Sequence, residues 1–162
     1  MTEDASFADG AGAAPLRLIA MDVEDLQVIS TLTQDAIFPI TAARLDKRKR
    51  RFAILLNRFR WEDATAAKDR SRPFERVQSV LHIEDVQAAA TDGLDLSDQD
   101  SVLSLLSIGF EAGADGTGRV ILTLAGDGAI ALDVECLEVG LRDVTRPYVA
   151  PSGKAPVHPE GD

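Results

Sequence analysis

The chain has 162 residues, of which 45% are hydrophobic and 27% are charged, as expected for one folded domain with an ordinary core. Its net charge of −10 disfavours binding of the whole protein to nucleic acid or to an anionic membrane. The start, MTEDASFADG, lacks the apolar run of a secretory signal, and no stretch approaches the about 20 apolar residues of a membrane span. A single cysteine, Cys136, excludes an intramolecular disulfide. We therefore expect a cytoplasmic protein.

Both ends of the chain differ in composition from the middle. Residues 1–15 are small, acidic and rich in Gly and Ala, and residues 146–162 contain four of the seven prolines. Such segments cannot bury enough apolar surface to offset the entropy of ordering. The sequence predicts two disordered tails, 1–15 and 146–162, around a single folded domain at 16–145.

The first predicted elements are a short strand over 16–21 and a helix over 22–34. Asp22 is the expected N-cap of this helix, because its side chain can accept a hydrogen bond from the first turn. Apolar residues recur every three positions and predict one buried face: Val23, Leu26, Ile29 and Leu32, with Val28 beside them. This is the only convincing helical pattern in the sequence.

The remaining apolar segments read as strands joined by short turns: 36–45, 50–61, 74–91, 101–111, 119–126 and 128–141. Pro39 favours an edge position or a bulge for the first of them. Segment 74–91 is long enough for two strands or one bent strand, and residues 137–144 fit either a strand or a helix. The predicted fold class is α+β, dominated by a mainly antiparallel sheet or open barrel of about six to eight strands, with one helix near the N-terminus.

Positive charge is concentrated in one part of the chain. Residues 44–61, RLDKRKRRFAILLNRFRW, hold eight of the seventeen Lys and Arg residues. Residues 44–76 carry a local balance of +7, and the rest of the chain carries −17. This asymmetry would suit pairing with a second copy or with another protein of mixed charge. Within the stretch, DKRK is predicted to be a solvated hairpin turn.

The NRFRW part is the candidate functional site. Strand alternation places Arg58 and Arg60 on one face, and Phe59 and Trp61 on the other. Neighbouring arginines can bind a carboxylate or phosphate, and Arg and Trp often anchor protein interfaces. The alternative is that Arg58 and Arg60 pair with acidic residues of a neighbouring strand while the aromatic residues lie in the core.

Residues typical of other chemistry are sparse. Two histidines and one cysteine offer no metal-ligand spacing, so no metal or other cofactor is expected. Cys136 lies in the run ALDVEC, which favours a buried structural thiol. His82 has the setting of an ordinary strand residue, and the glycine-rich segments are too short for a phosphate-binding loop. No catalytic motif was found.

Four segments resemble the uncharacterised bacterial "domain of unknown function 2948" family: RFAILLNRFRWE (51–62), FERVQSVLHIEDVQAAATDGLD (74–95), VLSLLSIGFE (102–111) and GDGAIALDVECLEVGLRDV (126–144). The resemblance begins at LRLIAMDVEDLQVIS, and NRFRWE is its most distinctive piece. It implies a small cytoplasmic bacterial protein and assigns no activity, ligand or site residue.

These observations favour a protein-binding or interaction module, capable of self-association and acting through Arg58, Arg60 and Trp61. The alternative is an enzyme, or a protein that binds a small anionic ligand, with an Arg-lined pocket between sheet and helix.

Overall fold

The computed structural model describes residues 14–64, 68 and 74–149. Its strands are β1 (Arg17–Ala20), β2 (Ile37–Pro39), β3 (Ala43–Asp46), β4 (Arg51–Phe59), β5 (Glu75–Ile83), β6 (Val86–Asp92), β7 (Val102–Ala112), β8 (Gly118–Leu124), β9 (Ala129–Val134), β10 (Val139–Asp143) and β11 (Tyr148–Val149). Its helices are α2 (Val23–Leu32) and the short 3₁₀ turns η1 (Ile40–Ala42), η2 (Trp61–Asp63) and η3 (Ala114–Gly116). Within the described residues, no helix combines the length and the apolar character that crossing a bilayer would need.

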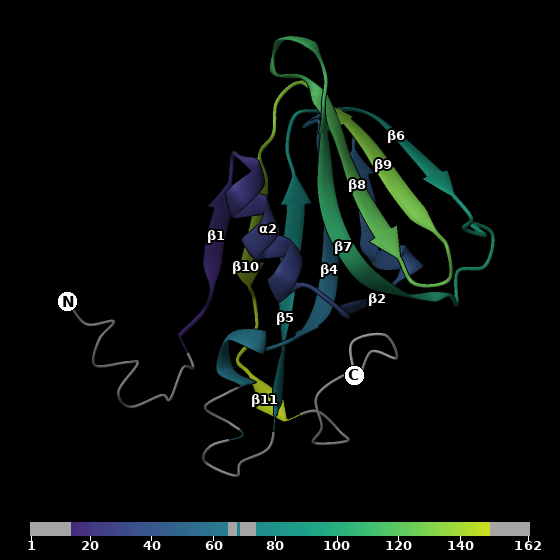
Figure 1. Ribbon diagram of the computed structural model, residues 1–162. Coiled ribbons are helices and arrows are strands. Elements are labelled where there is room, and N and C mark those ends of the chain that lie inside the picture. The colour runs from purple at the N-terminus through teal and green to yellow at the C-terminus, as the bar shows by residue number, and fades with distance from the viewer. Residues whose placement is uncertain (1–13, 65–67, 69–73, 150–162) are drawn as a thin grey trace.

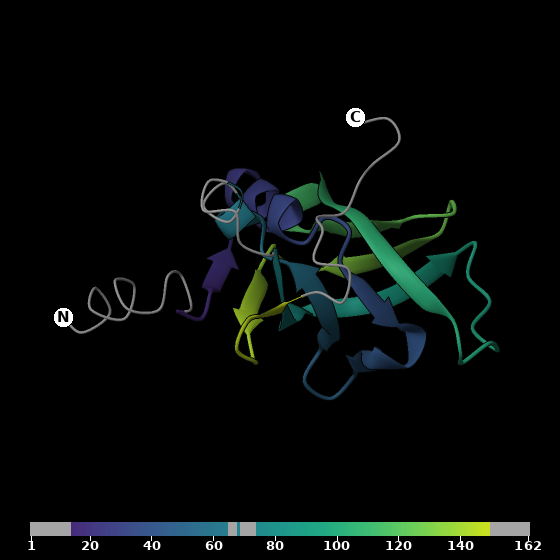
Figure 2. The same cartoon turned by 90° about the horizontal axis from the view of Figure 1, so that it is seen from below.

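All the strands belong to one antiparallel sheet with the order β1-β10-β5-β4-β2-β7-β8-β9-β6, while β11 pairs with β5 and β3 pairs with β4. The sheet bends, so that β5 and β4 in one half face β7, β8 and β9 in the other, as Figures 1 and 2 show. The strand-dominated, antiparallel class with one α-helix near the N-terminus is confirmed. The expected number of strands is wrong, because the described residues form a sheet of eleven strands.

Three local features raise the strand count. The segment predicted as one strand over 36–45 divides after Pro39, where η1 interrupts it. This short strand lies between β4 and β7 rather than at an edge, and the structure accommodates Pro39 because it is the last residue of β2. Segment 74–91 forms two strands, β5 and β6, separated by a turn in which Asp85 has φ 58°. Residues 139–143 form β10, which resolves the choice between strand and helix.

Helix α2 begins as the sequence predicts. The Asp22 side chain accepts a hydrogen bond of 2.8 Å from the Asp25 backbone N–H, as an N-cap does. Leu26 and Ile29 are buried, but Val23 is 58% exposed, so the predicted buried face is only partly correct. Ser30 is buried instead, because its hydroxyl accepts a hydrogen bond from the Ile108 N–H beside an irregularity in the β7–β8 ladder.

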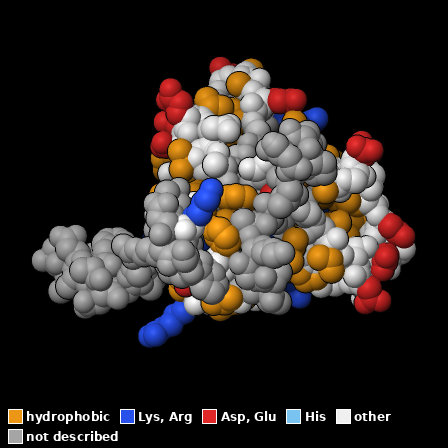
Figure 3. Space-filling view, turned by 60° about the horizontal axis from the view of Figure 1, so that its bottom comes forward, with side chains coloured by type: hydrophobic (Ala, Val, Ile, Leu, Met, Phe, Trp, Pro, Cys, Tyr) orange, Lys and Arg blue, Asp and Glu red, His pale blue; other side chains and the backbone are white. Residues whose placement is uncertain are grey.

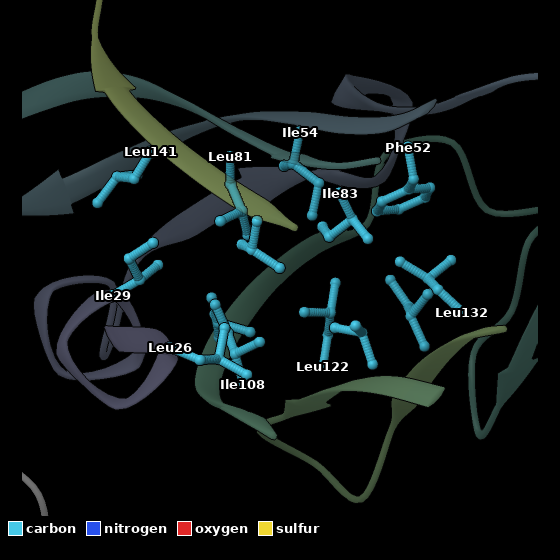
Figure 4. Packing of buried hydrophobic residues seen from close by; sticks show 14 of the residues in the cluster. Leu26, Ile29, Phe52, Ile54, Leu81, Ile83, Ile108, Leu122, Leu132 and Leu141 are labelled. Atoms are coloured by element: carbon cyan, nitrogen blue, oxygen red, sulfur yellow. The ribbon is translucent and has the colours of Figure 1, made fainter. Parts of the chain in front are cut away.

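The core lies between the two halves of the bent sheet. Figure 4 shows side chains from α2, β4, β5 and β10 directed toward side chains from β7, β8 and β9: Leu26, Ile29, Phe52, Ile54, Leu81, Ile83, Leu141, Ile108, Leu122 and Leu132. On β4 the buried positions alternate from Phe52 to Arg58, as expected for a strand with one face on the core, and Phe59 at its end is buried as well.

The chain remains in the sheet beyond the C-terminal boundary expected at residue 145. Tyr148 and Val149 form β11 and pair with Arg76 and Glu75 of β5. Residues 1–13 and 150–162, which make up most of the two expected tails, lie outside the described residues, as does most of the polar loop between η2 and β5.

Candidate functional site

Arg58 lies inside the protein. Alternation along β4 directs its side chain to the same face as Phe52 and Leu56, and the side chain is 0% exposed. Ser79 of β5 and Asp143 of β10 lie on that inner face beside it. Arg58 Nε donates to Ser79 Oγ at 3.1 Å, and Nη2 donates to Asp143 Oδ1 at 3.0 Å. Arg58 therefore belongs to an internal charge cluster.

Glu62, in η2, completes the neutralisation of Arg58. The guanidinium donates from Nη1 and Nη2 to the two carboxylate oxygens at 2.9 and 2.8 Å, a bidentate pair. Burial by itself would lower the pKa of Arg58, but the hydrogen bonds and charges of Glu62 and Asp143 outweigh it and raise that pKa. Burial by itself would raise the pKa of Glu62, but the hydrogen bonds and charge of Arg58 outweigh burial and lower that pKa. Both groups therefore remain charged.

Asp143 connects the cluster to the start of the fold. Its side chain accepts hydrogen bonds from Ser79 Oγ at 2.7 Å and from the Leu16 N–H at 2.9 Å. Its own backbone N–H donates to the Leu16 carbonyl at 2.9 Å. One carboxylate thus holds β4, β5, β10 and the residue that leads into β1. We conclude that this cluster of Arg58, Ser79 and Asp143, called the clasp below, stabilises the fold by joining these strands.

Arg60 and Trp61 are also engaged within the protein. Arg60, 4% exposed, hydrogen bonds to Glu75 and lies 3.4 Å from Asp63. Trp61 Nε1 donates to the Gln34 carbonyl after α2, at 2.9 Å. The Trp61 ring meets Phe59 edge to face at a centroid distance of 4.6 Å, and Phe59 is fully buried. The alternative weighed above, acidic partners for the arginines and packed aromatic residues, describes these positions.

The expectation that Arg58 binds an external anion or partner does not fit its place. A side chain with no exposed surface, whose charge two carboxylates already compensate, has nothing to offer a ligand without unfolding part of β4. Sequence reasoning had no way to choose between the two interpretations, because Asp143 is far away in the chain.

The opposite face of the same strands carries arginines that sequence reasoning missed. Arg17 of β1 lies directly opposite Arg142 of β10, and both are exposed. The same row continues through Val80 to Leu55, which is 43% exposed. Like charges directly opposite each other on a sheet are destabilising, so their presence calls for an explanation.

The next row of this outer face contains a glycine, Gly140 of β10. Ile19, 46% exposed, lies opposite Gly140, which lies opposite His82 and then Ala53. A Cβ atom at Gly140 would lie only 2.0 Å from His82 Nε2, so the imidazole needs a glycine beneath it. His82 Nδ1 is 2.6 Å from Glu84 Oε2. The eight residues of these two rows include no Asp or Glu, and the Glu84 carboxylate contacts His82 from beyond the end of β5.

Cys136 is exposed, contrary to the expectation of a buried thiol. It follows β9 in the connection to β10, where the alternation of buried positions has ended. Its thiol donates to Asp85 Oδ2 at 3.1 Å, and this hydrogen bond, with the nearby negative charge, raises the pKa of Cys136. The protonated form is therefore favoured.

Comparison with known proteins gives one decisive result. The sequence profile of the family described as Protein of unknown function (DUF2948) matches residues 16–158. The chain belongs to the DUF2948 family. The match extends past the last described strand, β11, and covers the whole described sheet. No curated protein and no solved structure matches the chain.

Proposed function

We propose that this DUF2948 protein is a cytoplasmic interaction module that binds an acidic protein partner through the outer face of β1, β10, β5 and β4. The observation that supports this proposal is the register of Arg17 opposite Arg142 on a partly apolar face. Their mutual repulsion would be relieved by a partner carboxylate placed between them.

The composition of this face matches that of protein interfaces. Arginine and apolar side chains are enriched at the centres of such interfaces, whereas carboxylates are depleted there. Ile19, two residues along β1 from Arg17, and Leu55, on β4 beyond Val80, supply exposed apolar surface on this face. Arg142 and Arg17 would direct the approach of an acidic surface, and the apolar side chains would slow its release.

The charge of the whole protein makes such a patch selective. At a net charge of −10, the protein repels other acidic proteins at long range, so only a partner that contacts this positive patch gains by approaching. An enzyme or anion-binding protein with an Arg-lined pocket between sheet and α2 gains no support, because Arg58 donates to Glu62 and Asp143 there.

The test is affinity capture from the native cytoplasm with the intact chain, compared with the double variant Arg17→Ala, Arg142→Ala. We expect a captured acidic protein and at least about a tenfold loss of capture by the variant, since interface arginines often contribute more than about 1 kcal/mol each. The matched control is Arg119→Ala, which removes an exposed arginine that pairs with Asp133 elsewhere. Equal capture by all three proteins would reject this face as the site.

A further inference from the structure

β6 is the last strand of the sheet, and one of its edges is open. In the described part of the chain it pairs with β9 only, and residues 87–92 are all exposed. Figure 1 shows β6 at the outer side of the molecule. An open strand edge presents backbone groups that can pair with another strand. A bulge between Val86 and Ala88 is its only local irregularity within that strand.

The open edge begins beside the basic turn of residues 47–50. The Val86 N–H donates to the Arg50 carbonyl at 2.9 Å, so this N–H points away from β9 and toward the turn. Lys47, Arg48 and Lys49 are exposed. Within the described residues, none of these three side chains forms an ion pair. One end of β6 is therefore adjacent to three basic side chains that form no ion pair among the described residues, beside Arg50, which pairs with Asp85 and Glu135.

The other end of β6 leads into an acidic loop, residues 92–100. Asp92, Asp95, Asp98 and Asp100 are exposed there. No ion pair of their side chains exists among the described residues. Figure 3, which keeps left and right as in Figure 1, shows acidic side chains grouped at the right-hand edge, the side on which β6 lies. The strand thus carries opposite charges at its two ends.

A groove of about 600 Å³ lies at the basic end. Leu45 of β3, Val86 and Ala89 contribute its apolar lining, and Lys47 and Arg50 its basic lining. At the opposite end of β6, the acidic loop exposes an apolar side chain, Leu96, to 59%. The groove extends along β6 from Val86 to Ala89, and Leu96 lies in the loop beyond the other end of the strand.

We infer that a second copy of this chain pairs with the first along β6, antiparallel and about a two-fold axis near Ala89. Antiparallel pairing places the C-terminal end of one β6 beside the N-terminal end of the other. Each acidic loop then lies on the partner's basic turn, and each Leu96 lies near the partner's groove. Because a two-fold contact uses the same patch twice, it closes after two chains.

A second copy fits this edge better than a foreign strand for one reason. Both halves of the charge complementarity, the basic turn and the acidic loop, are already present at opposite ends of the same strand, as self-pairing requires. Dimerisation leaves the outer face of β1, β10, β5 and β4 exposed, since that face lies on other strands. The inference is therefore independent of the proposed partner site.

The test is a charge exchange followed by analytical ultracentrifugation at low salt. The turn variant is Lys47→Glu, Lys49→Glu, and the loop variant is Asp92→Lys, Asp95→Lys. The turn variant leaves residues 47–50 without net charge, and the loop variant leaves residues 92–100 without net charge. Each variant thus loses the attraction between the two ends of β6, so we expect the dimer dissociation constant to rise at least about tenfold. Mixed together, the two variants regain one fully attractive contact, between the unchanged turn of one and the unchanged loop of the other, and we expect a one-to-one heterodimer.

The matched control is Arg17→Glu, Arg142→Glu, which changes the net charge as the turn variant does but on the outer face. It should dimerise as the native chain does, and thermal unfolding should show that every variant is folded. A native chain that remains monomeric at micromolar concentration would overturn the inference and would leave the β6 edge to a foreign strand. Dimers that survive either reversal, or variants that do not combine, would also overturn it.

Discussion

The inner face of β10 carries a charge with an opposite-charge partner, whereas its outer face carries a charge opposite a like charge. Asp143 points inward and holds Arg58 and Ser79, whereas the adjacent Arg142 points outward and faces another arginine. The inner charges must be compensated inside the chain, because an unpaired buried charge costs several kcal/mol. On the outer face, water screens the repulsion, so a like-charge pair can be retained for a partner. Of two consecutive residues, Asp143 thus stabilises the fold, and Arg142 belongs to the face that we propose for partner binding.

The largest expected difference between the faces is in stability. Arg58→Ala leaves Asp143 and Glu62 without their cation in a buried site and opens a cavity, so we expect a loss of about 3–5 kcal/mol of unfolding free energy. Arg142→Ala, on the outer face, should change it by less than about 0.5 kcal/mol. Urea unfolding measures both. Similar effects for the two variants would show that the clasp does not stabilise the fold.

The pH dependence of stability should distinguish the faces next. The pKa of Glu62 is lower in the folded chain than its ordinary value, so its contribution is present above that ordinary value and is lost as pH falls through the folded-state pKa. We expect Glu62→Gln to destabilise the protein most near neutral pH and progressively less as the pH is lowered toward about 3. Thermal unfolding across this range measures the difference.

A background without Arg58 supplies the control for this pH effect. In an Arg58→Ala chain, the Glu62→Gln substitution should have little pH-dependent effect, because the hydrogen bonds and charge of Arg58 are the largest influences that lower the pKa of Glu62. A pH effect that persists in that background would assign it to another group.

The smallest expected effect is on the outer pair. Arg17→Glu replaces a repulsive cross-strand pair by an attractive one with Arg142, and should stabilise the isolated chain by about 0.2–1 kcal/mol. Arg17→Gln, which only removes the repulsion, should give part of that gain. Both gains should shrink at high salt, as measured by urea unfolding. A destabilising Arg17→Glu would mean that the two side chains do not face each other in solution.

The parts of this fold that depend on local pattern could be predicted from the sequence. Alternating apolar residues identified β4 and β7, Asp22 marked the start of α2, and glycine-rich turns separated the last hairpins. The effect of Pro39 was harder to predict, because a three-residue strand between two others depends on how β7 approaches it. Val23 fits the helical period but is exposed, since α2 contacts the sheet along a narrower face.

The candidate site could be predicted only as far as its residue types. The sequence predicted that Arg58 and Phe59 point to opposite faces of the strand. It could not predict which face is buried, because that depends on β10, whose Asp143 lies far along the chain. Arg17 and Arg142 come from the two ends of the fold, so their pairing cannot be predicted from a local sequence pattern. Charge composition identified a positive segment correctly, yet both exposed arginines proposed for recognition, Arg17 and Arg142, lie outside it.

The short strand β2 has a consequence for how the molecule can open. It joins β4 through one residue pair, Ile37 with Asn57, and joins β7 through three. The two halves of the sheet are therefore held together here mainly by side-chain packing rather than by a long backbone ladder. Separation at this seam would break few hydrogen bonds and would leave the ladders on both sides intact. Partial opening between β2 and β4 should therefore cost less free energy than global unfolding.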